Sequence, residues 1–473
     1  MRWKIRRRSV LVAGALAVTV FVSSCANDGH DHFGANRTPA EAPAQGTAAE
    51  IQRDIAAVWP QIKTLWPGAD YSDYALILFT GEGGKVITID RTVDVTADDL
   101  ARENVRKPSQ GYGKASWQGH NAIVMIESDW ADMAKATGVQ ASRLISLVAT
   151  HEAFHFFAQQ LGDKDRAWPS LRSSAGTEAR GTLLPVVDEP RVLRASLVRE
   201  LRQAWLEPAE RDQRLAAAAY WNEQWKARYP DEVAAARETD ITEGTARYIE
   251  AAAELLMPTA DDPAEYRAQV ADGAFPMPPK YFALDSESYS IGSAAGLILQ
   301  QQNRRDWQQM IAQSGIAPVD VLLDGVTPVP QQADPELVAA VTRSGDEKRK
   351  IVDQTVAPLL TAYEDNTAPF LLLPAEARGT YSPGRFFIDI AEKPRQVYSG
   401  MNAEYKTASG TVAVKNAPAF TTEFDGHNYD LYLLAPEFGS QQNGTLTLDG
   451  EHLSGTVTVE ERSSAGRRFL IAK

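Results

Sequence analysis

Two histidines four residues apart, His151 and His155, lie within the most strongly helical stretch of the chain, residues 138–160. On an α-helix, positions i and i+4 share one face and lie one turn apart. The apolar residues on the same stripe are Leu144, Leu147, Val148, Phe154 and Ala158. The pattern therefore predicts a helix that is buried along the face carrying both imidazoles. Gly162 is the expected C-terminal stop of this helix.

Residues 151 to 155 read His-Glu-Ala-Phe-His, an HExxH motif. Two imidazoles on one helical face can bind one ion, and a catalytic zinc site has three protein ligands and one position open to water. Glu152 lies about 100° around the helix from His151, so it can reach that water and act as general base. These residues predict a Zn²⁺ site with His151 and His155 as ligands and Glu152 as a catalytic residue. The alternative is a pair of core histidines that bond to backbone carbonyls.

A third metal ligand must come from another segment. The metzincin pattern would need a glycine at position 158 and a histidine at 161, where this chain has Ala158 and Leu161. Residues 243–250 read Glu-Gly-Thr-Ala-Arg-Tyr-Ile-Glu, which is similar to the E-G-x-A-x-Y-x-E pattern of gluzincin-type zincin metallopeptidases. The resemblance implies that Glu243 is the third ligand, with Glu250 as the fallback. Glu250 is otherwise interpreted as an ion-pair partner of an arginine, or as a residue that orients a histidine.

The chain also departs from the gluzincin pattern. The thermolysin-like form has an aspartate four residues after the ligand glutamate, where this chain has Arg247. The residues considered for the missing partner of a zinc histidine are Asp163, Asp165 and Asp188. Residues 156–242 must hold further helices, since a bare loop of that length is unusual. Gly244 and Ala246 are small, which predicts a close approach of their helix to the histidine helix.

Two more segments resemble parts of gluzincin sites. Tyr289-Ser-Ile-Gly resembles a Y-x-x-G sequence before a helix behind the site, which implies that the Tyr289 hydroxyl stabilises a developing oxyanion. A simply packed tyrosine is the alternative, and Tyr248 is expected in the core. Peptidases of this type bind extended substrates along a sheet edge, and residues 120–125 are the candidate edge strand. An interior strand would have the same pattern.

The rest of the sequence predicts an α+β fold in two parts. Strands are expected at 74–79, 85–89 and 122–126, and helices at 48–65, through most of 189–257, at 291–302 and at 347–363. These form an expected zincin-like metallopeptidase domain over residues 47–366, with a small sheet and a mainly helical lobe.

The pattern changes near residue 368. Alternating runs such as Thr-Val-Thr-Val at 456–459, separated by Asn-Gly and Asp-Gly turns, predict a small antiparallel β-barrel or β-sandwich domain over residues 367–473. His427 and His452 lie at turns and are expected to be exposed. No chemistry is predicted for this domain.

The N-terminal 25 residues have the features of an export signal. Five basic residues precede the apolar stretch 9–22, and Val-Ser-Ser-Cys follows, which resembles a bacterial lipoprotein signal ending at Cys25. Cys25 is the only cysteine, so the mature chain is expected to be lipidated there and to form no intramolecular disulfide. Residues 26–46 are a predicted flexible tether. An ordinary secretory signal with an incidental cysteine is the alternative.

Composition limits the remaining possibilities. Hydrophobic residues make up 44% and charged residues 23% of the 473-residue chain, which is typical of folded proteins. The net charge of −14 argues against nucleic-acid binding, which needs a basic surface. The resemblance implies an exported peptidase, anchored to the cell envelope by lipid, that acts on a peptide or protein. Ala26 after the cysteine favours the outer membrane in a Gram-negative source. The alternatives are an envelope-binding lipoprotein with little or no activity, and a hydrolase of non-peptide amides.

Overall fold

The computed structural model describes residues 47–473 apart from 109–110, 162, 164, 172–180, 260–261, 278–282, 305, 366–367, 378–384, 391–392, 435–438 and 465. The predicted signal, the lipidation site Cys25 and the tether therefore lie outside the described residues. Within the described part, none of the helices combines the length and the apolar character needed to cross a membrane.

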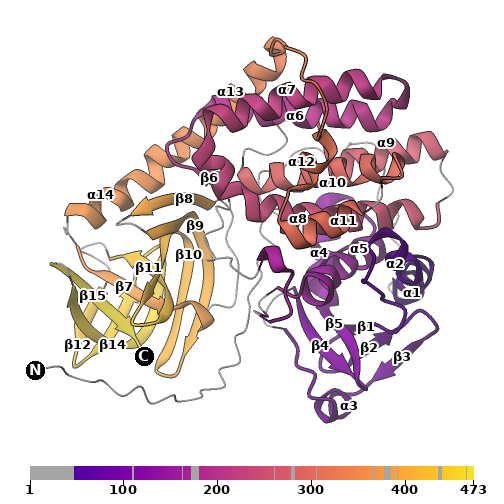
Figure 1. Ribbon diagram of the computed structural model, residues 1–473. Helices are drawn as coiled ribbons and strands as arrows, with labels where there is room; N and C mark the ends of the chain where they lie inside the picture. The colour runs from indigo at the N-terminus through magenta and orange to yellow at the C-terminus, as the bar shows by residue number, and fades with distance from the viewer. Residues whose placement is uncertain are drawn as a thin grey trace, which may run out of the picture.

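The N-terminal region contains a five-stranded sheet with the order β3-β2-β1-β5-β4 (Figure 1). Its strands are β1 (Ala75–Phe79), β2 (Gly84–Ile87), β3 (Thr92–Val95), β4 (Tyr112–Trp117) and β5 (His120–Ile126). β1 pairs in parallel with β5, whereas β2 and β4 are antiparallel to their neighbours. The three strands predicted in this region are confirmed. β3 and β4 are additional. β4 and β5 form a hairpin whose turn residues, Gln118 and Gly119, have φ values of 51° and 85°, and the sequence signal for this hairpin was the glycine at 119.

The predicted edge strand is wrong. Residues 120–125 belong to β5, which lies between β1 and β4 in the interior of the sheet. Residues 122–126 are all buried, because an interior strand is covered on both faces. β4 is the strand at this end of the described sheet.

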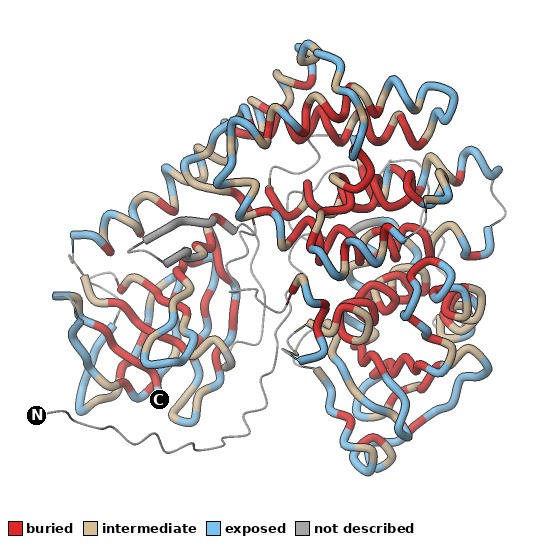
Figure 2. Tube along the Cα trace, viewed as in Figure 1, coloured by how far each residue is buried: buried red, intermediate tan, exposed pale blue. Residues whose placement is uncertain are grey.

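Helices α1 (Thr47–Val58) and α2 (Ile62–Leu65) precede the first sheet, and α3 (Ala97–Arg102) lies between β3 and β4. Between β5 and β7 most of the described chain is helical, in α4 (Glu127–Thr137), α5 (Ala141–Ala153), α6 (Asp188–Leu206), α7 (Arg211–Arg228), α8 (Pro230–Leu256), α9 (Pro263–Ala274), α10 (Leu284–Gln301), α11 (Trp307–Ser314), α12 (Pro318–Leu323), α13 (Pro335–Ile351) and α14 (Ala357–Asp365). Figure 2 shows that buried positions concentrate along α8 and α10, in the middle of this region. The long helical stretch predicted over 189–257 is confirmed as α6, α7 and α8. α10 begins seven residues before the predicted start at residue 291.

The histidine helix differs from its prediction at both ends. α5 begins at Ala141, and after Ala153 the chain continues as a π-helical turn, η2 (Phe154–Gln159). The turn ends at Gln160, which has a left-handed φ of 54°, so Gln160 takes the place of the predicted stop at Gly162. Gly162 itself lies outside the described residues. Short π-helical segments occur frequently at functional sites.

Helices α8 and α10 approach each other through two glycines. A Cβ atom on Gly292 would lie 2.2 Å from Cα of Gly244, so neither position has room for a side chain. The predicted approach of α8 to the histidine helix is present, but Gly244 faces α10 and so does not account for it. The contact sets the distance between the helix that carries Glu243 and the helix that carries Tyr289.

The C-terminal region is a separate all-sheet unit, as the alternating sequence predicts. Its ten-stranded sheet has the order β12-β13-β14-β15-β7-β11-β10-β9-β8-β6, and β14 also pairs with β10. The strands are β6 (Thr182–Leu183), β7 (Phe370–Pro374), β8 (Arg385–Ile390), β9 (Lys393–Thr407), β10 (Gly410–Phe424), β11 (His427–Leu433), β12 (Gly439–Gln442), β13 (Thr445–Asp449), β14 (Leu453–Ser464) and β15 (Arg467–Ala472).

Two features of this sheet were not predicted. The pairs β15–β7 and β6–β8 are parallel, so the sheet is not wholly antiparallel. β6 comes from the segment just before α6 and adds a strand from the helical region to the C-terminal sheet. Val356, Leu359 and Tyr363, from the end of the α13–α14 segment, pack in one hydrophobic cluster with residues of the sheet. The C-terminal sheet is therefore joined to the helical region by both backbone pairing and side-chain packing.

The glycine contact generates a stability prediction. We expect Gly292→Ala to destabilise the protein by about 1–3 kcal/mol, because the new methyl group forces α8 and α10 apart. Gly273→Ala in α9 is the matched control, because a Cβ at Gly273 meets no atom within 4 Å. That change should be neutral or stabilising, by at most about 1 kcal/mol. Chemical denaturation of both variants measures the difference, and equal stabilities would contradict the proposed contact.

Candidate metal centre

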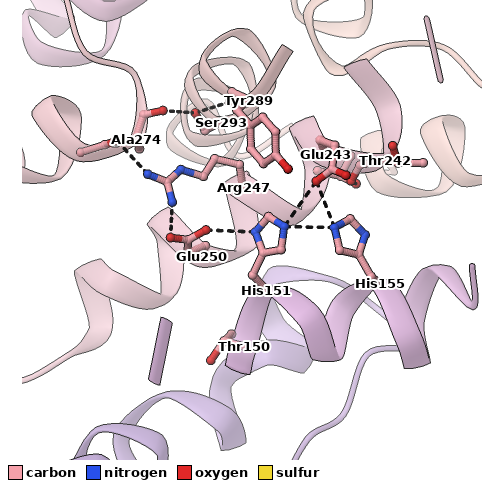
Figure 3. A network of polar contacts seen from close by, with 12 residues as sticks. Thr150, His151, His155, Thr242, Glu243, Arg247, Glu250, Ala274, Tyr289 and Ser293 are labelled. Atoms are coloured by element: carbon pink, nitrogen blue, oxygen red, sulfur yellow. Dashed lines mark hydrogen bonds and ion pairs between the residues drawn. The ribbon is translucent and has the colours of Figure 1, made fainter. Parts of the chain in front are cut away.

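The three predicted ligands converge on one point. His151 lies near the end of α5, His155 follows in the π-helical turn η2, and Glu243 comes from the middle of α8. Figure 3 shows the three side chains directed toward one another. His155 and Glu243 are each only 1% exposed and His151 is 6% exposed, so the group lies inside the protein. One ligand atom from each residue lies within 4.8 Å of the others, which is close enough for all three to hold one metal ion.

The distances between the three atoms are short. Nε2 of His155 lies 3.0 Å from Nε2 of His151 and 3.1 Å from Oε2 of Glu243. The remaining side of the triangle, from His151 Nε2 to Glu243 Oε2, is 3.5 Å.

The other nitrogen of each imidazole has its own acceptor. His151 Nδ1 lies 3.0 Å from Oε2 of Glu250, and His155 Nδ1 lies 2.7 Å from Oε1 of Gln159. The orientation of the Gln159 amide is set, because its Nε2 donates to the carbonyl oxygen of Thr242 and to Oγ1 of Thr245. A carboxylate and an amide oxygen only accept, so both Nδ1 atoms carry hydrogen. In the neutral rings both Nε2 atoms therefore present lone pairs to the centre of the triangle.

Three electron-rich atoms this close together in a buried site require a positive charge between them. The charge can be a metal ion or a proton. Burial disfavours the charged form of His151, but the carboxylates of Glu243 and Glu250 outweigh burial and raise the pKa of His151 from 6.5 to about 10. The metal-free site therefore holds a proton at neutral pH, and a metal ion must displace it.

Glu250 resolves one of the open interpretations. Its carboxylate contacts His151 on one side and pairs with Arg247 on the other, so it is a partner of a histidine and of an arginine. Burial alone would raise the pKa of Glu250, but Arg247 and His151 lower it to about 2. Arg247 also donates to the carbonyl oxygen of Gly273, 2.7 Å away. Glu250 thus supplies the histidine partner that was missing from the predicted pattern, one turn beyond the expected aspartate position.

The three aspartates considered for that role lie elsewhere. Asp188 forms an ion pair with Arg349, and Asp163 and Asp165 lie in the exposed loop after η2. Sequence analysis missed Gln159, the partner of His155. The available signal was its spacing, because Gln159 lies four residues after His155 and so on the same side of the helix.

Glu152 is buried beside the ligands and is 4% exposed. The Oε2 atom of Glu152 is buried without a hydrogen-bond partner. Burial raises the pKa of Glu152 above its ordinary value. The free oxygen is thus a desolvated acceptor close to the metal ligands, a condition that favours proton uptake.

Tyr289 lies where the sequence places it, next to the ligands. Its ring is nearly parallel to that of His151, with 6.0 Å between the ring centroids and an angle of 18° between the planes. In Figure 3 its hydroxyl points toward the metal-binding side chains. Tyr248 is 1% exposed and packs against Trp307, as expected of a core residue. His427 and His452 are exposed in the C-terminal sheet, also as expected.

Comparison of the chain with protein-family models, with curated proteins and with solved structures found no match. The interpretation of the site therefore rests on its own geometry and chemistry.

The contact of Glu250 with His151 predicts an effect on metal affinity. Glu250→Gln should weaken metal binding about 10- to 100-fold, because the charged partner that orients His151 and raises its basicity is lost. Glu254→Gln is the matched control, since Glu254 lies one turn further along α8 and pairs with Arg143, not with a histidine. Titration against a chromophoric chelator measures both affinities. If the two variants bind metal equally well, Glu250 has no such role.

The raised pKa of His151 predicts proton release on metal binding. At pH 7 the metal-free histidine is protonated, because its pKa is about 10, whereas the metal needs the neutral ring. Binding should release about one proton, and the apparent affinity should rise up to about tenfold per pH unit as the pH approaches the pKa of His151. Calorimetry at pH 7 in two buffers with different ionisation enthalpies measures the release. Binding heats that do not depend on the buffer would contradict the protonation of His151.

Proposed function

We propose that the protein is a zinc-dependent peptidase of the gluzincin type. The observation that carries the proposal is the convergence of His151, His155 and Glu243 beside a buried Glu152 carboxylate with an unpartnered oxygen. The proposal includes a zincin-like fold for residues 47–366. It also includes export and anchoring to the cell envelope through a lipid on Cys25, for which the support is the N-terminal sequence.

The donor set supports zinc as the metal. Two imidazole nitrogens and one carboxylate oxygen are common catalytic zinc ligands, and they leave a fourth position open. A tetrahedral site with metal–ligand bonds of about 2.0–2.1 Å separates ligand atoms by roughly 3.3 Å. The three separations in this site, 3.0, 3.1 and 3.5 Å, lie close to that value. Oxygen-preferring ions such as Mg²⁺ and Ca²⁺ fit less well, because two of the three donors are nitrogens.

The proposed reaction divides the work among named side chains. Zinc bound at this site would polarise the scissile carbonyl and lower the pKa of water. Glu152 accepts the proton of the attacking water through its free oxygen and returns it to the leaving amine. The Tyr289 hydroxyl, next to His151, donates to the oxygen that gains negative charge.

The position of β4 favours an extended peptide as the substrate over a small amide. β4 ends the described sheet, and its Lys114 donates to the carbonyl oxygen of Phe156, in the turn that carries His155, at 3.3 Å. A peptide that pairs with β4 by backbone hydrogen bonds would lie near that turn. β4 therefore takes the role that the sequence assigned to residues 120–125.

The competing interpretation is a binding lipoprotein that has lost activity. Its support in the sequence was the predicted lipid anchor, the β domain and the absent aspartate in the Glu243 helix. Glu250 contacts His151, as such an aspartate would contact a zinc histidine, so the third of these supports is weakened.

The role of Glu152 generates a decisive prediction. Glu152→Gln should retain one bound zinc per chain, because Glu152 is not a ligand. It should lose about 10²- to 10⁴-fold in turnover, because the amide cannot accept the proton. Elemental analysis and the digestion of fluorescein-labelled casein and a peptide library measure the two properties, with Glu254→Gln as the control. Unchanged turnover would refute the assigned role, and zinc-loaded wild type without any hydrolysis would favour the binding lipoprotein.

A further inference from the structure

We propose that Lys114, on the edge strand β4, is a specificity-determining residue that binds a carboxylate of the peptide substrate beside the metal centre. The inference rests on the proposed function, because it names the substrate class of the same site, which is peptides that present an acidic group to Lys114. Either an aspartate or glutamate side chain or the C-terminus of the peptide supplies the carboxylate.

Alternation along β4 directs Lys114 to the face of the sheet on which the metal-binding turn lies. Neighbouring side chains of a strand point to opposite faces. Ala115 packs against the hydrophobic cluster on one face, whereas Tyr112 packs against the cluster on the other, which includes Phe156. Lys114 shares the face of Tyr112, and its ammonium group donates to the carbonyl oxygen of Phe156 at 3.3 Å. Phe156 directly follows the ligand His155, so the ammonium group lies at the turn that carries this ligand.

The ammonium group of Lys114 has unused hydrogen-bonding capacity. A lysine has three N–H donors, and among the described residues the Phe156 carbonyl is the acceptor that Lys114 reaches. Nζ also lies 5.0 Å from the centroid of the Phe157 ring, on its apolar side. Burial lowers the pKa of Lys114 from its ordinary value, so its charge is partly desolvated. An anionic ligand would stabilise such a charge.

Lys114 also lacks a counter-ion of its own. In the described part of the chain, no carboxylate forms an ion pair with it, and the acidic group that acts on it most is Asp163. Asp163 lies 3.9 Å from Arg166, whose positive charge opposes this effect. Lys85, the other lysine in the strands of this sheet, instead pairs with Asp94 on the neighbouring strand. The positive charge of Lys114 is therefore free to attract a ligand.

A peptide that pairs with β4 would bring its own side chains next to Lys114. In the described sheet β4 has a neighbouring strand, β5, on one side only, and Lys114 is exposed. Side chains directly opposite each other on paired strands have Cβ atoms about 4.5–5.5 Å apart, and opposite charges at such positions attract. An acidic side chain at the position opposite Lys114, or the terminal carboxylate of a peptide that ends there, would lie within reach of the ammonium group. A neutral side chain at this position would leave the charge without a partner.

Peptide binding to the zinc-loaded Glu152→Gln protein tests the inference without cleavage. The probes are short fluorescein-labelled peptides with amidated C-termini, in which one glutamate is moved along a neutral sequence, and each has a glutamine counterpart. Fluorescence anisotropy should show that glutamate at a particular position tightens binding about 10- to 100-fold over glutamine, as expected for a hydrogen bond between charged groups. Addition of Lys114→Met should remove this preference and leave the affinity for the glutamine peptides unchanged.

A second pair of probes distinguishes the two sources of the carboxylate. The neutral peptide is compared with a free and with an amidated C-terminus. If a free terminus tightens binding through Lys114 and an internal glutamate does not, the ligand is the end of the chain. The opposite result identifies an acidic side chain.

Charge reversal separates recognition of the substrate from a purely structural role. Lys114→Glu should favour lysine over glutamate at the position that wild type reads, because the sign of the attraction is reversed. Lys85→Met is the matched control, since Lys85 pairs with Asp94 in the same sheet, and it should keep the wild-type preference. Unfolding temperature and bound zinc are measured for every variant. If Lys114 only ties β4 to the histidine turn, its substitution weakens all peptides equally and charge reversal changes no preference.

The outcomes separate this inference from the proposed function. Equal binding of the acidic and neutral peptides, a preference that survives Lys114→Met, or no binding of any peptide would each overturn the inference. If zinc-loaded wild type binds acidic peptides through Lys114 but cleaves nothing, the proposed function fails and the inference stands. If wild type cleaves peptides with the same kcat/KM for the glutamate and glutamine forms, the proposed function stands and the inference fails.

Discussion

The electrostatic repulsion among three buried donor atoms is the constraint on which the site depends. Two imidazole nitrogens and one carboxylate oxygen lie 3.0 to 3.5 Å apart, and the acceptors on the far side of each imidazole direct both lone pairs inward. Such an arrangement is stable only with a cation at its centre, and a proton and a metal ion compete for that position. Glu250 and Gln159 hold the rings in this state. The chemistry of the site thus follows from residues that are not themselves ligands.

The surrounding helices keep the third ligand in place. Gly244 and Gly292 allow α8 and α10 to touch, and Arg194 joins the same two helices through ion pairs with Asp240 and Glu287, each at 2.8 Å. Arg194 is 1% exposed, and its guanidinium lies over the ring of Trp225, so the charges are both paired and covered. These contacts determine where Glu243 and Tyr289 lie relative to the histidines. The five-stranded sheet contacts the histidine turn through Lys114, which donates to the carbonyl oxygen of Phe156.

The C-terminal sheet is connected more closely to the helical region than a simple appended domain would be. β6 pairs with β8, and the backbone N–H of Leu284, at the start of α10, donates to the carbonyl oxygen of Gly181 next to β6. The helix that carries Tyr289 is therefore tied to the segment that completes the C-terminal sheet. The short β6 strand showed no alternating pattern of its own, which is why sequence analysis placed the whole sheet after residue 367.

Local periodicity alone determined a buried helix with His151 and His155 on one face, Glu152 about 100° around that helix from His151, and the alternating strands of the C-terminal region. These features repeat within one or two turns, so nearby residues specify them. Glu243 was found only through a resemblance, because it lies 88 residues from His155. Tertiary packing decided the roles of Gln159 and Glu250, the π-helical turn, and the order of β4 and β5. The physical reason is that hydrophobic packing is non-directional, so the partners of a side chain across the core depend on the whole chain.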